Sequence, residues 1–218
     1  MMDNITAFLP SWKRHENVRL IIPALRAQTV NPKIVLINTG DPYEGPEPDE
    51  VWQVPFPTGP FIKFQIAAYY DGYLYFNDDD ILPRNTRLIG QMLWQLRMNG
   101  DKGIVGAKAR DVWPNPPHYK HGDTRGPWTN NIKMGCAIMH RTALELVRTP
   151  PFDMPHRCDD IHVSLEIGRG EGVHYVNRAW ASMILDLDGC DRPGFCKEPE
   201  HYDEREGYCA RWMKENWS

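Results

Sequence analysis

Three consecutive aspartates follow an aromatic, apolar stretch, and they are the residues of this chain best suited to do chemistry. Residues 73–76 read Tyr-Leu-Tyr-Phe, the composition of a buried strand, and Asp78, Asp79 and Asp80 begin one residue later. In an extended chain Asp78 and Asp80 point to one face and Asp79 to the other. Carboxylates this close repel one another unless a cation neutralises them, and oxygen ligands suit Mg²⁺ or Mn²⁺. A solvated acidic turn is the alternative, but the position at a strand end favours a metal site.

The chain contains no glycine-rich phosphate-binding motif. Neither Gly-x-Gly-x-x-Gly nor the Walker P-loop pattern occurs, which excludes the dinucleotide fingerprint and the Walker phosphate cradle. The glycine and the distant glutamate of an EF-hand loop are also missing. A metal would therefore have to bind the phosphates of a nucleotide substrate. A divalent cation between two carboxylates and a diphosphate neutralises the negative charge that grows as the diphosphate leaves.

Apolar runs that alternate between strand-like and helical spacing predict an α/β fold. The aliphatic run Ile34–Ile37 is typical of a strand buried on both faces of a parallel sheet. Pro10 is expected to end the first strand, residues 11–17 to form a polar loop, and Pro23 to kink the first helix or delay its start. The expected strands are residues 5–9, 34–37, 51–55, 73–76, 104–107, 132–140, 173–176 and 183–187, and the expected helices are 18–28, 61–70, 84–99, 141–148, 160–167 and 204–216.

Three of the expected strands end in polar residues, at 11–14, 38–41 and 78–80. Ligands of open α/β sheets bind beyond the carboxyl ends of the strands. We therefore expect these three strand ends to converge on one crevice.

Size and composition predict one domain in a reducing compartment. The chain has 218 residues, 41% hydrophobic content and a formal net charge of −4, which suffices for one sizeable core and argues against dominant nonspecific nucleic-acid binding. No stretch reaches the length of a membrane span and no signal pattern opens the chain, so we expect a cytoplasmic protein. Five cysteines without a Cys-x-x-Cys pair fit reduced thiols, and a zinc knot of Cys190, Cys196, His201 and Cys209 is the alternative.

An irregular segment over residues 111–131 carries the rings of Trp113, His118, Tyr119 and Trp128. Long loops in compact domains are more often functional than idle. Interleaved cations and rings can bind a sugar phosphate or a nucleic acid, whereas the rings alone could close over a donor as a lid. Residues 108–133 contain five cationic side chains and two carboxylates. The cations are Lys108, Arg110, Lys120, Arg125 and Lys133.

Five segments, in this order, resemble the GT-A nucleotide-sugar glycosyltransferases, especially their family 2-like members. Asp78–Asp80 is similar to the D-x-D metal motif of that family, and Cys158–Ile161, which reads Cys-Asp-Asp-Ile, to the acidic pair that contains its catalytic carboxylate. The other segments are 9–17, similar to the first nucleotide-binding loop, 34–40, similar to the second strand, and 135–141, similar to the strand before the acceptor-side helix.

The resemblance implies a single GT-A (Rossmann-like) domain over residues 1–218, with a mixed, mostly parallel central sheet flanked by helices. It also implies that residues 1–107 form the nucleotide-sugar-binding half. Residues 108–218 would then form the acceptor-binding and catalytic half.

Carried over position by position, the resemblance implies four groups of site residues. The donor would be held by Pro10, Ser11, Trp12, Arg14, Asn38, Lys63, Asp78 and Asp79, with Trp12 and Arg14 at the nucleobase and Lys63 at the diphosphate or sugar. The metal ligands would be Asp80, Asp78 and His201, with Asp186 and Asp188 as further candidates. The acceptor would meet Trp113, His118, Tyr119, Trp128 and Gly135. The catalytic carboxylates would be Asp160 and Asp159.

The implied activity is transfer of a sugar from a nucleotide-diphosphate sugar, in the first instance a UDP-sugar such as UDP-glucose, to an acceptor hydroxyl, with Mn²⁺ or Mg²⁺ as cofactor. In an inverting reaction Asp160 would take the hydroxyl proton as general base; alternatively, Asp159 and Asp160 only cap the following helix. The segment Cys158–Ile161 also resembles exostosin-type retaining transferases, so the stereochemistry is open. Asn38 stands where the family usually has an aspartate that reads uracil, so the donor base is open too.

Three other functions are compatible with these patterns. The same chemistry could modify a hydroxymethylated base in DNA, which would have to be flipped out of a duplex. A sugar nucleotidyltransferase should carry a glycine-rich basic loop near its N-terminus, but residues 11–17 contain no glycine. A noncatalytic sugar- or nucleotide-binding module would keep the fold without turnover, and an Asp160→Asn variant would separate it from an enzyme.

Overall fold

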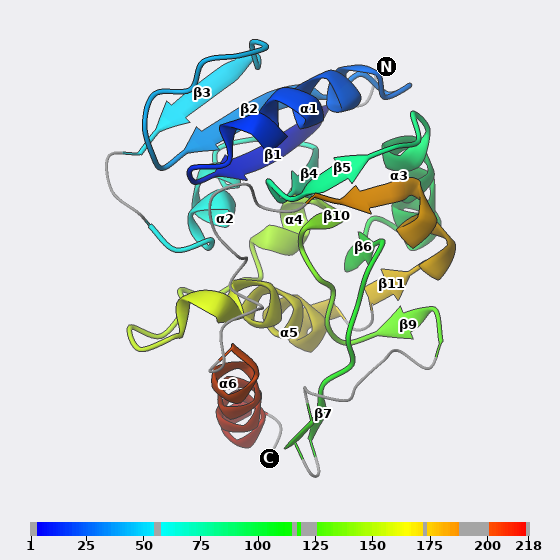
Figure 1. Cartoon of the computed structure of the whole chain (residues 1–218). Helices are drawn as coiled ribbons and strands as arrows, with labels where there is room; N and C mark the ends of the chain where they lie inside the picture. Colours follow the sequence, from blue (N-terminus) through cyan, green and yellow to red (C-terminus); the bar gives the residue numbers. More distant parts are fainter. Residues whose placement is uncertain are drawn as a thin grey trace.

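The computed structural model describes residues 4–54, 58–114, 117–118, 126–171, 174–187 and 201–216. In these residues an eight-stranded sheet has the order β3-β2-β1-β4-β10-β6-β11-β9, with helices on both faces (Figure 1). Its strands are β1 Ile5–Ser11, β2 Lys33–Asn38, β3 Glu50–Gln53, β4 Tyr73–Asn77, β6 Ile104–Gly106, β9 Trp128–Thr129, β10 Cys136–His140 and β11 His174–Val176. The helices are α1 His15–Arg26, α2 Ile62–Ala67, α3 Leu88–Met98, α4 Arg141–Leu144, α5 Asp159–Glu171 and α6 His201–Asn216, with 3-10 turns η1 His156–Cys158 and η2 Arg178–Met183. Two further antiparallel pairs join β5 Ile81–Pro83 to β12 Ile184–Asp186 and β7 Trp113–Pro114 to β8 Pro117–His118.

Most neighbouring strands of the sheet are parallel. β1 pairs in parallel with β2 and β4, β2 with β3, and β6 with β11. β10 runs antiparallel between β4 and β6, and β9 runs antiparallel at the β11 edge. The predicted α/β fold with a mixed, mostly parallel sheet is confirmed, and the carboxyl ends of β1, β2 and β4 share one edge of it.

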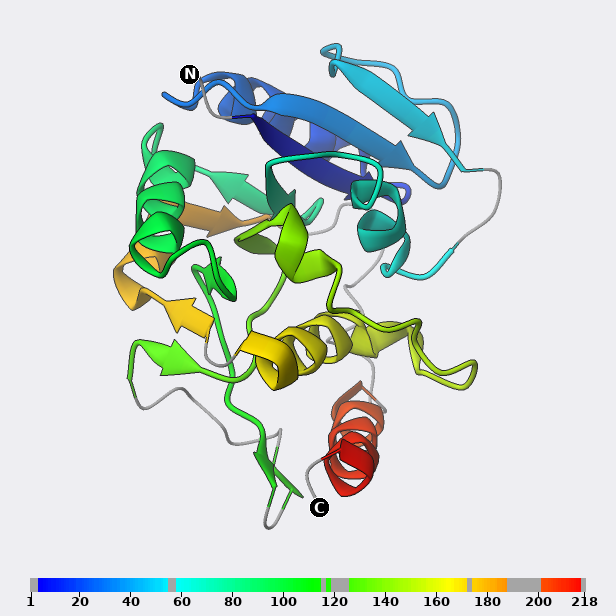
Figure 2. The ribbon, with the colours of Figure 1, turned by 180° about the vertical axis from the view of Figure 1, so that it is seen from behind.

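Side-chain alternation along β1 divides the core into two layers. Ala7 and Leu9 pack in the layer under α1 and α3, whereas Phe8 packs in the layer under α2, α4 and α5, the face seen in Figure 2. All three side chains are fully buried. Apolar side chains cover both faces of the sheet, and their burial stabilises it by roughly 25 cal/mol per Å² of buried apolar area. The strands that carry the polar residues at their ends are therefore anchored in the core.

Helix α6 packs on η1 through a smaller apolar cluster. Cys158, Cys209 and Trp212 belong to this cluster, and both thiols are fully buried. Burial raises the pKa of the Cys209 thiol far above its ordinary value. Cys209 is part of this packing, while Cys190, Cys196 and the side chain of His201, the other members of the alternative zinc knot, lie outside what the structure describes.

Pro10 does not end the first strand, and Pro23 does not delay the start of the first helix. β1 continues through Pro10 to Ser11 because its ladder with β4 ends at Phe8, so the strand is by then paired on one side only. α1 begins at His15 and runs through Pro23. Pro23 lies on the exposed face of α1, where water can satisfy the carbonyl that loses its partner.

The segment expected to be one irregular loop contains strands. Its residues 113–118 include the short pair β7–β8, and Trp128–Thr129 forms β9, which joins the main sheet. The strand expected over residues 132–140 is regular only from Cys136, because residues 132–133 pair instead with residues 108–109. Among the described helices none has the length and apolar content needed to cross a bilayer.

Candidate active site

The three aspartates form a turn at the end of β4 rather than an extension of it. The strand ends at Asn77, and the Ile81 amide donates to the Asp78 carbonyl at 3.1 Å. Asp79 and Asp80 consequently both reach one guanidinium, that of Arg14. The expectation that Asp78 and Asp80 share a face opposite Asp79 was wrong, because strand alternation applies only to extended backbone.

The loop after β1 is tied to this acidic turn. Arg14 Nη1 donates to Asp79 Oδ1 at 2.8 Å and to Asp80 Oδ2 at 3.0 Å, and the Trp12 amide donates to Asp79 Oδ2 at 3.2 Å. Burial raises the pKa of Asp79 to about 7, against the opposing effect of Arg14. The carboxyl ends of β1 and β4 thus converge, as predicted, and Asp79 with Arg14 holds them together.

The end of β2 joins the same edge through Ser11 and Asn38. The Thr39 amide donates to the Ser11 carbonyl at 3.0 Å. Asn38 is fully buried, and its Nδ2 donates to the Asp41 carbonyl at 2.6 Å and to Gln53 Oε1 at 2.9 Å. The amide predicted to read the nucleobase is therefore engaged within the protein.

Ser11 carries a buried hydroxyl that no protein group satisfies. The residue is 2% exposed, and its Oγ has no hydrogen-bond partner in the described part of the chain. A buried polar atom without a partner costs about 1–3 kcal/mol. Ser11 lies at the convergent strand ends, where a bound nucleotide could supply that missing partner.

Lys63 of α2 connects the acidic turn to the second pair of carboxylates. Its Nζ lies 2.9 Å from Asp78 Oδ1 and 3.4 Å from Asp159 Oδ2, and its side chain is 3% exposed. Burial lowers the pKa of Lys63, but Asp78 and Asp159 raise it more, so the ammonium stays charged. Lys63 therefore neutralises the turn and the α5 carboxylates together, and it brings them to one place.

The two carboxylates at the start of α5 have different partners. Asp160 accepts from Arg205 Nη2 of α6 at 2.6 and 2.7 Å, and both side chains are nearly buried. Asp159 faces Lys63 instead, and burial raises the pKa of Asp159 to about 6, with Lys63 opposing. Asp160 is held in place by its own counterion, whereas burial makes the Asp159 carboxylate easier to protonate than an ordinary aspartate.

Gly135 lies against the acidic turn at the start of β10. Its carbonyl accepts from the Asp78 amide at 2.9 Å, and a Cβ at this position would lie 2.7 Å from Asp78 Oδ2. A separation below 3.0 Å requires the neighbouring atom to move. The predicted site residue Gly135 is thus placed at Asp78, where it leaves room for the carboxylate.

A Gly135→Ala variant is expected to fold normally but to lose metal-dependent activity about tenfold, because the methyl group displaces the Asp78 carboxylate, and well-placed carboxylates are needed for a metal site. Donor hydrolysis against Mn²⁺ concentration measures the effect. Gly126→Ala is the matched control, since a Cβ at Gly126 meets nothing within 4 Å. Equal activity of the two variants would contradict this role of Gly135.

The pairing of β5 with β12 adds Asp186 to the acidic side. Asp186 lies opposite Ile81, and the Leu187 amide donates to the Asp80 carbonyl at 2.7 Å. Burial and the charges of Asp78 and Asp186 raise the pKa of Asp80 above its ordinary value. Asp186, one of the further metal candidates, is therefore close to Asp80, whereas the side chain of His201 and the whole of Asp188 lie outside what the structure describes.

The carboxylates fit a hard divalent cation that is shared with a substrate. In the described residues no group of three or more His, Cys, Asp or Glu side chains is gathered closely enough to hold a metal alone. Mg²⁺ is usually held by one or two carboxylates together with substrate phosphates, and Mn²⁺ accepts the same oxygen ligands. Asp78 and Asp80 supply two such oxygens beside Arg14 and Lys63, so the residues present suit a metal that arrives with a diphosphate.

Of the ring residues predicted to meet the acceptor, Trp128 is the one whose side chain the structure describes, and it lies away from these carboxylates. Trp128 lies on β9, at the opposite edge of the sheet from β3, and packs edge-on against Tyr175 at 5.3 Å. Trp113 and His118 lie in the β7–β8 pair, which contacts α6. Tyr119 is outside the described residues.

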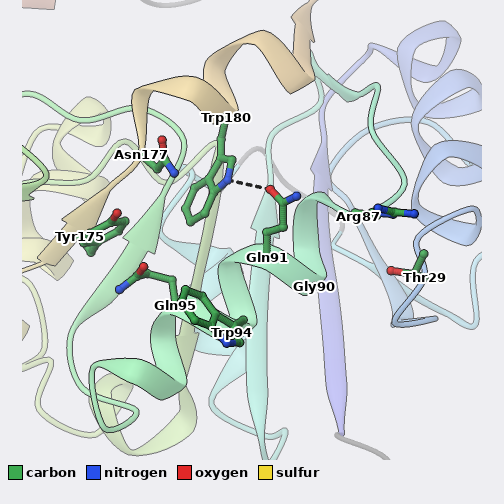
Figure 3. Close-up of a pocket in the computed structure, with 9 residues that line it drawn as sticks. All are labelled: Thr29, Arg87, Gly90, Gln91, Trp94, Gln95, Tyr175, Asn177 and Trp180. Carbon is green, nitrogen blue, oxygen red and sulfur yellow. Dashed lines mark hydrogen bonds between the residues drawn. The ribbon is translucent and has the colours of Figure 1, made fainter.

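A cavity of about 510 Å³ lies apart from the acidic turn, between α3 and η2 (Figure 3). Trp180 Nε1 donates to Gln91 Oε1 across it at 2.9 Å. Trp94, Tyr175 and Asn177 also line it. None of the site residues predicted from the sequence is among the residues that line this cavity.

Three residues at the site were missed by sequence reasoning. His15 and Gln53 fix Asn38, with His15 Nε2 at 3.3 Å from Asn38 Oδ1. Arg205 reaches Asp160 across 45 positions of sequence. The sequence contains no signal for such a long-range pair. It shows only that the helix expected over residues 204–216 contains a cation.

No protein-family model and no curated protein sequence matches the chain. The structure is similar to the mannosyltransferase PcManGT from Pyrobaculum calidifontis, determined in complex with GDP-Man and Mn²⁺, with a TM-score of 0.64 and 13% identity over 89% of this chain and 59% of that one. It is also similar to residues 1–349 of TarS from S. aureus, with a TM-score of 0.55 and 11% identity over 80% of this chain and 58% of that one. A mycobacterial protein matches with a TM-score of 0.52 and 12% identity over 80% of this chain and 65% of that one.

At this level of identity the similarity establishes the fold. The chain spans 59% of the length of the mannosyltransferase chain. The chain has the GT-A-like fold of nucleotide-sugar glycosyltransferases.

Proposed function

We propose that this chain is a glycosyltransferase that moves a sugar from a nucleotide-diphosphate sugar to an acceptor hydroxyl. The observation that carries the proposal is the Lys63 bridge, which places the acidic turn at Asp78 beside the carboxylate of Asp159. In a GT-A-like fold this arrangement puts a diphosphate-binding edge next to a candidate base. Residues 1–107 would hold the donor, and residues 108–218 would hold the acceptor and supply the base.

The donor lies along the ends of β1, β2 and β4. Ser11 Oγ, which lacks a protein partner, can donate to a ribose or phosphate oxygen. Trp12 follows Ser11 and offers a ring to the base, while Arg14 keeps the loop in position through Asp79. A UDP-sugar is the first donor to test. GDP-mannose is the second, because the similar mannosyltransferase was determined with GDP-Man and Asn38 is engaged by Gln53.

Asp78 and Asp80 would hold Mn²⁺ or Mg²⁺ together with the donor diphosphate, and Asp186 is the nearest further carboxylate. When bound, such a cation neutralises the diphosphate as it leaves. The protein itself contributes half-buried Arg14 and buried Lys63 at this edge, two cations that reduce the repulsion among the carboxylates. Their positive charge also favours binding of a phosphate dianion at this edge.

Asp159 is the better candidate for the base, although the resemblance pointed first to Asp160. A base must be free to accept the proton of the acceptor hydroxyl, and Asp160 has both oxygens on Arg205. In the transfer the acceptor oxygen bonds to the anomeric carbon, the bond from that carbon to the diphosphate oxygen breaks, and the hydroxyl proton moves to Asp159. Asp160 would position Asp159 by fixing the first turn of α5.

Donor hydrolysis is the experiment that tests this proposal. Purified protein is incubated with Mn²⁺ or Mg²⁺ and a panel of UDP-, GDP-, ADP- and dTDP-sugars, and the released nucleoside diphosphate is measured. We expect metal-dependent release from one class of donor. Asp80→Asn is expected to raise the Mn²⁺ concentration needed for half-maximal hydrolysis about a hundredfold, since even indirect contacts of a metal site contribute about 10- to 100-fold to metal affinity.

Failure would take a distinct form for each alternative function. Binding of a nucleotide sugar without hydrolysis or transfer under any metal would indicate a noncatalytic module. Formation of a nucleotide sugar from a nucleoside triphosphate and a sugar phosphate would indicate a nucleotidyltransferase. Transfer to DNA containing hydroxymethylated bases would identify the nucleic-acid acceptor.

A further inference from the structure

Three cations on the acceptor half lie on one face of a two-stranded ladder. Ala109 and Ile132 form an antiparallel bridge, flanked by hydrogen bonds from the Lys133 amide to the Lys108 carbonyl at 3.0 Å and from the Arg110 amide to the Asn131 carbonyl at 3.1 Å. The two segments run side by side in Figure 1. This register sets Lys108 opposite Lys133, and Arg110 lies two residues from Lys108 on the same face.

The other face of the ladder is covered, so the cations cannot turn inward. Ile132 is fully buried, and Ala109 packs against the same apolar layer. Lys108, Arg110 and Lys133 therefore point away from this layer: Lys108 reaches Asp186 of β12, and the Arg110 guanidinium lies over the Tyr202 ring of α6 at 5.5 Å.

The ladder lies next to the first turns of α5, the helix that begins with Asp159 and Asp160. Ser164 of α5 hydrogen-bonds both backbone groups of Ile132, with Oγ at 3.1 Å from the amide and 3.3 Å from the carbonyl. Asp160 lies four residues before Ser164 and so on the same face of α5. On the other side Lys133 is two residues from Gly135, whose carbonyl accepts from the Asp78 amide. Lys133 thus lies between the start of α5 and the acidic turn.

The carboxylates near these cations are already engaged. Asp160 is paired with Arg205 at 2.6 Å, and Asp186 with Lys108 at 2.6 Å. In the described part of the chain Lys133 has no hydrogen bond or ion pair through its side chain. Burial and the charge of Arg110 lower the pKa of Lys133, and Asp160 offsets this only in part. Neighbouring cations repel one another and destabilise the protein. An anion bound at the Lys133 ammonium would be attracted by these cations and would relieve their repulsion.

We propose that Lys133, with Lys108 and Arg110 beside it, binds a phosphate group of the acceptor, next to the hydroxyl that receives the sugar. The inference rests on the proposed function and adds the chemical class of the acceptor, a phosphate ester. The acceptor stands on the base side of the site, beyond Lys63 and Asp159, whereas the donor diphosphate stands at Asp78 and Asp80. A protein of net charge −4 and a cluster of this size suit one phosphate better than a nucleic-acid backbone.

Binding of inorganic phosphate in the absence of metal tests the site directly. Affinity is measured by calorimetry against chloride at matched ionic strength. Lys133→Gln is expected to bind phosphate about tenfold more weakly than the wild type, because a hydrogen bond to a charged group is worth about 1.5–3 kcal/mol. Lys133→Arg should restore binding. Lys102→Gln, an exposed lysine on another loop, is the control and should change nothing. Equal affinity of Lys133→Gln and Lys102→Gln would overturn the inference.

Repeating the titration with nucleoside diphosphate and Mn²⁺ bound separates the acceptor from the donor. Phosphate affinity is expected to stay within about twofold. Loss of phosphate binding in that complex, with a raised KM for the donor in Lys133→Gln, would assign the cations to the donor diphosphate and overturn the inference. A duplex oligonucleotide could instead compete with phosphate for Lys133. If the salt dependence of its affinity corresponds to contacts with several phosphates, the single-phosphate acceptor is overturned in favour of a nucleic acid.

Failure of the proposed function is distinguishable from failure of the inference. If no nucleotide sugar is hydrolysed while Lys133-dependent phosphate binding persists, the acceptor role is overturned together with the proposed function, and an anion site is left. If donor hydrolysis is intact and Lys133→Gln binds phosphate normally, the inference alone is overturned.

Discussion

Replacing Asp159 with asparagine is expected to lower kcat for donor hydrolysis or transfer by about 10²- to 10⁴-fold, the usual contribution of a general base, while donor and Mn²⁺ still bind. Asparagine keeps the shape and the contact with Lys63 but cannot accept a proton. The carboxylate of Asp159 lies 3.4 Å from Lys63, which also holds Asp78. Steady-state kinetics combined with a binding assay for the donor measure the two effects separately.

The pH dependence follows from the same group. Burial raises the pKa of Asp159 to about 6, above the usual value of about 3.9. A base works only when deprotonated, so wild-type kcat should fall as the pH drops through about 6 and level off above it. Asp159→Asn should lose this dependence along with its activity.

Asp71→Asn is a matched control, because Asp71 is exposed and lies before β4 rather than at its end. Its kinetics should equal those of the wild type. Full activity of Asp159→Asn, together with an inactive and normally stable Asp160→Asn, would show that Asp160 is the base after all.

Breaking the pair between Asp160 and Arg205 should destabilise the fold by about 3–5 kcal/mol, as removal of one partner from a buried ion pair does. Both oxygens of Asp160 lie on Arg205, and the two side chains are 12% and 7% exposed. Arg205→Met would leave a buried carboxylate without its partner. For a domain of this size the melting temperature should drop by about 10 °C, at about 2–4 °C per kcal/mol.

The control for this experiment lies on the same helix. Arg211 pairs with Asp153, and those side chains are 39% and 65% exposed, so Arg211→Met should cost about 1 kcal/mol or less. In the double variant Asp160→Leu with Arg205→Met, most of the lost stability should return, because no unpaired charge is then buried. Denaturant unfolding of the set measures the coupling. If Arg205→Met costs no more than Arg211→Met, the pair does not anchor α6 to α5.

The two sets of variants separate the roles of neighbouring carboxylates. Asp159→Asn is expected to change turnover and pH dependence with little loss of stability. Asp160→Asn is expected to change stability first, and turnover through the position of α5. Cys158 precedes the pair and is fully buried in the cluster under α6, so the start of α5 has little freedom to adjust.

The sequence by itself determined the class of fold and predicted where the site lies. Apolar periodicity predicted most strands and helices, because burial on both faces of a sheet demands long aliphatic runs such as Ile34–Ile37. The aspartates after residues 73–76 marked the edge that we propose binds the donor. Adjacent carboxylates at a strand end repel one another unless a cation lies near them. Their position in the sequence therefore predicts a cation there without any knowledge of the structure.

The tertiary structure alone decided which charged groups meet. Lys63, Asp159 and Asp78 come from three separate elements, and only the packing of α2 and α5 against β4 brings them together. The backbone turn at 78–80, the capture of Asp160 by Arg205 and the common face of Lys108 and Lys133 are likewise invisible in local patterns. Pairing between distant segments depends on register and burial summed over the whole chain, whereas sequence periodicity reports only on neighbours.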